Sequence, residues 1–240
     1  MTNLKRLLIA TILFTGSSSL ISAEQRVERV DIKRSLEYLL FLPQQYERSQ
    51  SWPLIVFLHG AGERGSNIER VKKHGPPKIV QTKPGFEFIV VSPQCPANQR
   101  WNAPDVMALV QHIKSSYQVD QERIYLTGLS MGGYGTWDTA ARYPYEFAAI
   151  APICGGGNPR SARRISHLPT WVFHGAKDRI VPLSESQAMV AGMEKAGGAP
   201  KLTIYPEKDH DSWTASYANP ELYRWFLKHK KQPRPERRRR

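Results

Sequence analysis

Six short, continuous runs of apolar and β-branched residues alternate with helical patterns, and this alternation constrains the fold more than any other feature. The runs occupy residues 53–58, 86–91, 123–126, 147–153, 170–173 and 201–205. A continuous apolar run is typical of a strand that is buried on both faces of a parallel sheet. Strands that alternate with helices predict right-handed crossovers, so we expect an α/β fold with helices on both faces of a mostly parallel sheet.

The helical patterns have clear ends. We predict helices over residues 104–117, 131–143, 183–196 and 221–230. Pro104 suits a first helical turn, and Gly197-Gly198 is a natural stop for the third helix. Two further apolar runs, at residues 27–32 and 36–42, predict an N-terminal antiparallel hairpin.

A glycine-flanked serine lies between a predicted strand and a predicted helix. The segment Gly128-Leu-Ser-Met-Gly132 matches the pattern G-x-S-x-G. In a strand–turn–helix context this pattern indicates a nucleophile elbow, where a flanking side chain would clash and glycine is needed. We therefore predict an α/β-hydrolase fold with Ser130 as the nucleophile. A glycine-rich turn with an incidental serine is the alternative.

A serine hydroxyl needs a base to accept its proton, and in this fold the acid and then the histidine follow the serine. His210 follows the last predicted strand and is our candidate base. Asp178 follows the strand at residues 170–173 and is predicted to orient the imidazole of His210. A solvated loop aspartate is the alternative for Asp178. We interpret His174, at a strand end, as a packed structural residue.

Backbone N–H groups must stabilise the charge that develops on the substrate oxygen. One donor is expected from Met131, directly after the serine. The other is expected from the loop at residues 59–65, where small residues permit close backbone approach, and we favour the N–H of Ala61. His59 precedes the serine, so we expect it to hold this loop by hydrogen bonds.

Five motifs resemble those of a known group of enzymes. They are His-Gly-Ala-Gly-Glu-Arg-Gly at 59–65, Gly-Leu-Ser-Met-Gly-Gly-Tyr-Gly-Thr-Trp at 128–137, Pro-Ile-Cys-Gly-Gly-Gly at 152–157, Phe-His-Gly-Ala-Lys-Asp at 173–178 and Asp-His-Asp-Ser-Trp at 209–213. The chain resembles bacterial phospholipase/carboxylesterase-like α/β hydrolases, often labelled predicted peptidases. It is also similar to polyhydroxybutyrate depolymerase-like and feruloyl-esterase-like proteins. The resemblance covers nearly all of residues 30–227 and implies a triad of Ser130, Asp178 and His210.

The sequence also bears on the substrate. The link from Cys154 to Thr170 is short and polar, which leaves little room for an apolar lid and favours small soluble esters. We expect Trp101 and Trp213 each either to form a wall of the substrate pocket or to pack beneath the loops. Three arginines either flank the mouth of the site or are solvated: Arg160, Arg163 and Arg164.

We expect no metal and no cofactor, because no Cys/His cluster has metal-ligand spacing and no phosphate-binding loop is present. Cys95 and Cys154 follow strands that two central strands separate. That separation is about 14 Å, whereas a disulfide needs Cα atoms within about 7 Å, so both thiols are predicted to be free.

The two ends of the chain differ in composition from the body. Lys5 and Arg6, an apolar run over residues 7–14 and Ala23 predict a signal peptide at residues 1–23, and an uncleaved anchor is the alternative. We expect a catalytic domain over residues 24–230 and a basic disordered tail over residues 231–240. Of the net charge of +13, residues 228–240 carry +7, residues 1–23 carry +2 and the body only +4.

These observations predict a secreted or periplasmic serine hydrolase that cleaves small soluble carboxylic esters through an acyl-enzyme on Ser130. The nearest alternative is a peptidase or amidase with the same triad, and a non-catalytic binding protein of this fold is another. We expect no specific nucleic-acid partner and no integral membrane association. The arginine tail allows weak contact with anionic surfaces.

Overall fold

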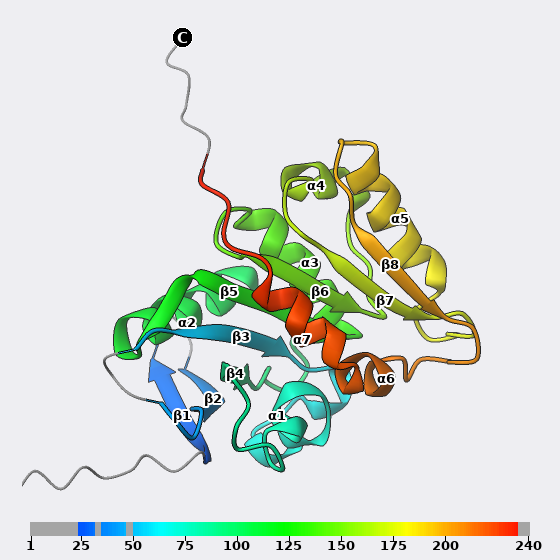
Figure 1. Ribbon diagram of the computed structural model, residues 1–240. Coiled ribbons are helices and arrows are strands. Elements are labelled where there is room, and N and C mark those ends of the chain that lie inside the picture. Colours follow the sequence, from blue (N-terminus) through cyan, green and yellow to red (C-terminus); the bar gives the residue numbers. More distant parts are fainter. Residues whose placement is uncertain (1–23, 32–34, 47–49, 235–240) are drawn as a thin grey trace, which may run out of the picture.

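The computed structural model describes residues 24–31, 35–46 and 50–234, which form an eight-stranded sheet with helices on both faces (Figure 1). The expected signal peptide, residues 1–23, lies outside the described residues. Residues 235–240 of the expected tail do so as well.

The sheet is mostly parallel. Its strands are β1 (Gln25–Asp31), β2 (Ser35–Phe41), β3 (Trp52–Leu58), β4 (Ile89–Pro93), β5 (Val119–Leu129), β6 (Ala149–Ile153), β7 (Trp171–Gly175) and β8 (Lys201–Tyr205). They lie in the order β1-β2-β4-β3-β5-β6-β7-β8. β1 and β2 form an antiparallel hairpin, β2 is antiparallel to β4, and the remaining neighbours are parallel. The predicted architecture, including the N-terminal hairpin, is confirmed.

Helices cover the two faces unequally. The α-helices are α1 (Gly75–Ile79), α2 (Ala103–Ser116), α3 (Met131–Arg142), α4 (Pro159–Ala162), α5 (Leu183–Glu194), α6 (Trp213–Ala218) and α7 (Pro220–Leu227). Short 3-10 helices are η1 (Ala61–Glu63), η2 (Ile68–Lys73) and η3 (Arg163–Ile165). Figure 1 shows α2, α3, α4 and α5 on one face of the sheet, and α1, α6 and α7 on the other.

Two hydrophobic clusters lie between these layers, one on each face of the sheet. Trp137 of α3 and Leu109 of α2 are fully buried in the first cluster. Leu222 and Phe226 of α7 are fully buried in the second, which extends to Tyr217 of α6. Each fully buried large apolar side chain stabilises the fold by about 1.5–3 kcal/mol. The helices are thus fixed on the sheet by burial of their apolar faces.

Element boundaries depart from the sequence expectation where local hydrogen bonds intervene. The strand expected from residue 86 begins at Ile89, because the Phe86 N–H instead donates to Lys83 O in a turn. Phe86 and Phe88 still contribute to the core, where both rings pack against Tyr223. The short helices η1, η2, α1 and α6 were not predicted, because each has too few residues to show a helical period.

Both cysteines are free, as predicted, and both are buried. Cys95 follows β4 and Cys154 follows β6, and β3 and β5 lie between these strands. Separation across the sheet therefore keeps the two thiols apart.

The C-terminal segment stays in contact with the domain beyond the expected boundary at residue 230. The Lys231 N–H donates to Glu122 O at 2.7 Å, and the guanidinium of Arg234 lies 5.8 Å from the ring centre of Tyr145. Among the described residues, we find no helix with the length and apolar character needed to cross a bilayer.

The first turn of α3 packs against the end of β3 with no space for a side chain. A Cβ atom added at Gly132 would lie 1.8 Å from Leu58 O, and one added at Gly128 would lie 2.4 Å from Gly132 O. Both neighbours are backbone atoms, so they cannot rotate away. Glycine at these positions is therefore a condition for this strand–turn–helix connection.

We expect Gly132→Ala to destabilise the protein by about 3 kcal/mol, because the added methyl group forces α3 away from β3. Gly85→Ala is the control, since a Cβ there meets no atom within 4 Å. It should stay within about 0.5 kcal/mol of wild type. Urea denaturation measures both, and equal stabilities for the two variants would contradict the role of the close contact.

Candidate active site

Ser130 lies in the turn between β5 and α3 with an unusual backbone. Its φ of 52° and ψ of −117° are rare for a residue with a side chain. The Ser130 N–H donates to Ile153 O at the end of β6, at 2.9 Å. Surrounding structure therefore holds this strained conformation, which is common at functional sites.

Ser130, His210 and Asp178 form one chain of hydrogen bonds. The His210 Nε2 atom lies 3.0 Å from the Ser130 Oγ, and the His210 Nδ1 atom lies 2.7 Å from an Asp178 carboxylate oxygen. Asp178 follows β7 and His210 follows β8, while Ser130 follows β5. The structure thus brings together the three residues singled out from the sequence.

Asp178 is held as a carboxylate. Its side chain is fully buried, and burial alone would raise its pKa. The bond with His210 and the N–H groups of Val181 and Ile180, each 2.9 Å from the second carboxylate oxygen, outweigh that cost and lower the pKa below its usual value. A buried negative charge is therefore available to stabilise a protonated His210.

His174 is a further partner of Asp178. Its Nε2 atom lies 3.2 Å from the carboxylate and 2.8 Å from Val181 O. Both neighbours only accept, so this nitrogen must carry a proton. Its Nδ1 atom lies 2.7 Å from Ser186 Oγ. The sequence predicted a packed structural residue, and the structure adds that His174 contacts the acid.

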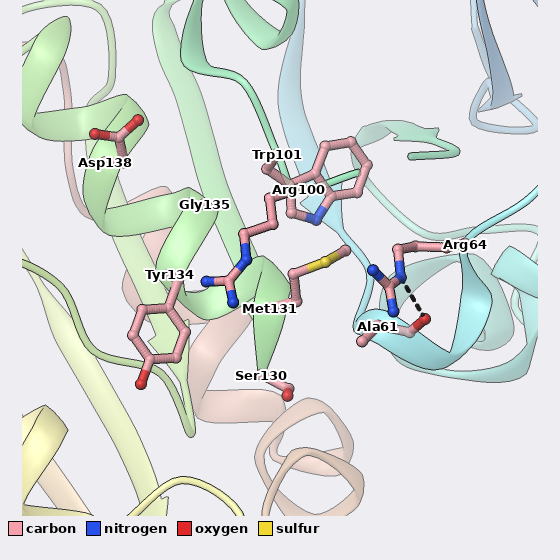
Figure 2. Close-up of a pocket in the computed structure, with 9 residues that line it drawn as sticks. All are labelled: Ala61, Arg64, Arg100, Trp101, Ser130, Met131, Tyr134, Gly135 and Asp138. Carbon is pink, nitrogen blue, oxygen red and sulfur yellow. Dashed lines mark hydrogen bonds between the residues drawn. The ribbon is translucent and has the colours of Figure 1, made fainter. Parts of the chain in front are cut away.

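A pocket of about 340 Å³ opens beside Ser130 (Figure 2). Its lining residues come from η1 and the residue after it, the segment before α2, the turn before α3, and α3: Ala61, Arg64, Arg100, Trp101, Ser130, Met131, Tyr134, Gly135 and Asp138. Asp138 lies far from Ser130 in Figure 2 and pairs with Arg142. Arg100 and Tyr134 were not singled out in the sequence, which carries no local signal for them.

The two predicted tryptophans line different pockets. Trp101 lines the pocket of Figure 2, and its indole N–H also donates to His59 O at 3.0 Å. Trp213 packs edge-on against His210, with 5.2 Å between ring centres. Trp213 also lines a second pocket. Trp101 therefore both lines a pocket and packs against the loop at residues 59–65.

The two residues predicted to supply backbone donors line the same pocket as Ser130. Met131 is the first residue of α3, so its N–H is among those with no partner inside the helix. Ala61 opens η1, and its carbonyl accepts from Arg64 Nε at 3.0 Å (Figure 2). Met131 and Ala61 both line the pocket with Ser130.

His59 holds the loop at residues 59–65 by hydrogen bonds, as expected. It accepts from the Cys95 N–H through Nε2 at 2.9 Å and donates from Nδ1 to Gly60 O at 2.6 Å. Burial lowers the pKa of His59 to about 4. A neutral imidazole therefore ties the end of β3 to the end of β4.

Cys154 Sγ comes within 4.8 Å of potential ligand atoms of Asp178 and His210. The sequence could not show this grouping, since the three residues follow different strands. Burial raises the pKa of the Cys154 thiol to about 12, so it stays protonated. The other two side chains bond to each other. This chemistry favours the hydrogen-bond chain over a metal centre.

The link from Cys154 to Thr170 folds into α4 and η3, which pack against α5. No helix was predicted in this link from the sequence. Arg163 and Arg164 are exposed there and, like Arg160, are not among the residues that line the pocket at Ser130. Their exposure fits the solvated alternative.

The fold and the site together define an α/β hydrolase: a mostly parallel sheet with Ser130, Asp178 and His210 joined where its strands end. More narrowly, the chain belongs to the dienelactone hydrolase family, whose model matches residues 38–221.

Individual relatives are esterases and depolymerases. Poly(3-hydroxyalkanoate) depolymerase C of Paucimonas lemoignei is 31% identical over 43% of this chain and 28% of its own length. Feruloyl esterase C of Emericella nidulans is 28% identical over 61% of this chain and 56% of its own length. The solved structure of a thermostable esterase superposes with a TM-score of 0.76 and 31% identity, covering 88% of this chain and 64% of that one. The chain thus spans 28% to 64% of the length of these relatives.

We expect stability to depend on pH through His59. Between its unfolded pKa of 6.5 and its folded pKa of about 4, only the unfolded chain binds the proton. Stability therefore falls as pH falls through this range, by up to about 1.4 kcal/mol per pH unit. His59→Asn removes this contribution and flattens the slope, whereas the control His112→Asn should not. Denaturation between pH 7 and pH 4 measures it, and an unchanged slope in His59→Asn would contradict the assignment.

Proposed function

We propose that this protein is a serine hydrolase that cleaves carboxylic esters of small soluble substrates through an acyl-enzyme on Ser130. The observation that carries the proposal is the continuous hydrogen-bond chain from Ser130 Oγ through His210 to buried Asp178. The esterase and depolymerase names of its relatives support an ester as the bond that is cleaved.

In acylation, Ser130 Oγ attacks the ester carbonyl carbon while His210 Nε2 accepts the hydroxyl proton. Asp178 fixes the tautomer of His210 and stabilises its positive charge. The C–O bond to the alcohol then breaks, and His210 returns the proton to the leaving oxygen. Water attacks the acyl-enzyme by the same route and releases the acid.

The negative oxygen of each tetrahedral intermediate needs donors that are already in place. The N–H groups of Met131 and Ala61 are the proposed donors, because both residues line the pocket together with Ser130. Removing one such donor costs on the order of 3 kcal/mol in transition-state stabilisation. No step of this mechanism calls for a metal or a cofactor.

Substrate size follows from the pocket of Figure 2. A volume of about 340 Å³ lies at the low end for small-molecule sites, so a short acyl group fits best. We propose that Trp101 forms a wall of this acyl site. Trp213, beside His210, faces the departing alcohol.

Export is part of the proposal. The basic start, apolar run and Ala23 of residues 1–23 support a signal peptide, and thus a secreted or periplasmic enzyme. N-terminal sequencing of protein recovered outside the cytoplasm checks this, with Glu24 as the expected first residue. Recovery of only uncleaved, cell-retained protein would contradict export.

A fluorophosphonate probe tests the nucleophile. Wild type should be labelled, Ser130→Ala should not, and the exposed control Ser51→Ala should be labelled like wild type. Ester hydrolysis by Ser130→Ala should fall by at least about 10³-fold. Equal labelling of wild type and Ser130→Ala would refute the assignment.

Asp178→Asn tests the acid. We expect kcat to fall by about 10³- to 10⁴-fold with little change in KM, because an amide cannot stabilise the imidazolium. Hydrolysis of a panel of p-nitrophenyl esters measures the loss of kcat. Comparison with anilides of the same acids shows whether the protein prefers ester or amide bonds. Faster cleavage of the anilides would point to the amidase alternative.

A further inference from the structure

Asp178 has a second imidazole partner that the proposed mechanism does not use. The same carboxylate oxygen, Oδ2, lies 2.7 Å from His210 Nδ1 and 3.2 Å from His174 Nε2. The other oxygen, Oδ1, accepts from the N–H groups of Ile180 and Val181. An ionised carboxylate has about four lone-pair sites, so four donors occupy all of them. His174 therefore supplies the last of the four partners that hold the acid.

The two imidazoles on Oδ2 differ in how firmly the protein holds them. The side chain of His174 is fully buried, whereas that of His210 is 19% exposed. His174 belongs to β7 and is paired in register with Ile204 of β8. His210 lies in the loop after β8, outside any helix or strand. His174 is therefore the fixed ring, and the position of Oδ2 follows from it.

Ser186, near the start of α5, fixes the orientation of the His174 ring. Its Oγ atom lies 2.7 Å from His174 Nδ1 and 3.0 Å from Gly155 O. Ser186 is fully buried, so water does not compete for these contacts. At the other end of the ring, Nε2 faces Asp178 and the carbonyl of Val181. A ring flip would place carbon atoms at both contacts, so the ring is held in one orientation.

The segment that carries Gly155 also holds the turn at Ser130. Ile153, at the end of β6, accepts the Ser130 N–H at 2.9 Å. Gly155 packs against α3, where a Cβ atom added to Gly155 would lie 2.7 Å from the Cα atom of Gly133. Residues 153–155 therefore contact the nucleophile turn on one side and Ser186 on the other.

These contacts close into a ring. The hydrogen-bond chain of the proposed mechanism is one part of the ring, and His174, Ser186 and residues 153–155 form the rest. Every member of this second part is buried. The acid and the nucleophile are thus positioned against the same buried segment.

We propose that His174, held by Ser186, is a positioning residue for the acid: it places Asp178 Oδ2 where the His210 Nδ1–H can donate to it. His210 then keeps its Nε2 atom free to accept the proton of Ser130. This inference rests on the proposed function for its effect on activity, whereas the hydrogen bond between His210 and Asp178 is measured without substrate.

Hydrolysis of p-nitrophenyl acetate tests the role kinetically. His174→Leu removes the Nε2–H donor. We expect kcat to fall by about 10- to 100-fold and KM to change by less than about twofold, because misplaced reacting groups slow the chemical step more than binding. His174→Gln keeps an N–H donor near the place of Nε2 and should recover most of the loss. Ser186→Ala leaves Nδ1 without its partner and should lower kcat by a smaller factor.

Val172→Ala is the matched control for lost packing. Val172 lies on the same face of β7, two residues before His174, and is also fully buried. Val172→Ala should lower the midpoint of urea denaturation, as His174→Leu does, and leave kcat unchanged. Equal kcat values for folded His174→Leu and Val172→Ala would overturn the proposal.

Proton NMR of the free protein gives a readout that lost packing does not move. The His210 Nδ1–H proton, which Asp178 accepts, should give a strongly deshielded resonance that is absent in His210→Gln. We expect it to move upfield or broaden in His174→Leu and Ser186→Ala, and to stay near its wild-type position in His174→Gln and Val172→Ala. An unchanged resonance in both His174→Leu and Ser186→Ala refutes the positioning role. If His174→Leu does not fold, Ser186→Ala decides.

The two proposals fail separately. If wild type hydrolyses no ester, the proposed function is wrong, and the resonance of His210 still decides whether His174 positions the acid. If esters are cleaved but His174→Leu matches Val172→Ala in kcat and in this resonance, the protein is an esterase and the inference about His174 is wrong.

Discussion

The contact between the first turn of α3 and the end of β3 is the constraint on which the site depends. Gly132 approaches Leu58 O so closely that a single added carbon would overlap it. This approach fixes where α3 begins, and therefore where the turn presents Ser130. It also brings the N-terminus of α3 next to the loop that carries Ala61, so both proposed oxyanion donors depend on the same contact.

The site also requires that buried Asp178 keep its negative charge. A buried carboxylate is costly unless charge-assisted hydrogen bonds satisfy it. Two backbone N–H groups and His210 satisfy Asp178, and His174 adds a fourth contact at 3.2 Å. His210 and the two backbone N–H groups lower the pKa of Asp178 despite its burial. The acid is thus fixed in position and charge by residues that come from its own loop and from the ends of β7 and β8.

The sequence predicted most of the fold because long buried runs have a clear signal, and β8 matches the expected range at both ends. It also pointed to Ser130, Asp178 and His210, since each directly follows a predicted strand or its turn. It could not reveal the contact of Asp178 with His174, or the grouping of Trp213 with His74. Residues 74 and 213 are joined only by tertiary packing of α1 beside α6, and helices as short as these have no readable period.

The connection between β3 and β4, residues 59–88, supplies a large part of the walls of both pockets. Ala61 and Arg64, near its start, line the pocket beside Ser130, whereas Lys73, His74 and Lys78 further on line the pocket beyond Trp213. The serine, the acid and the histidine all come from later parts of the chain. Part of the walls of both pockets is thus encoded in a different stretch of sequence from the three residues of the hydrogen-bond chain. Substitutions of side chains in this one connection can therefore reshape both pockets while Ser130, Asp178 and His210 stay as they are.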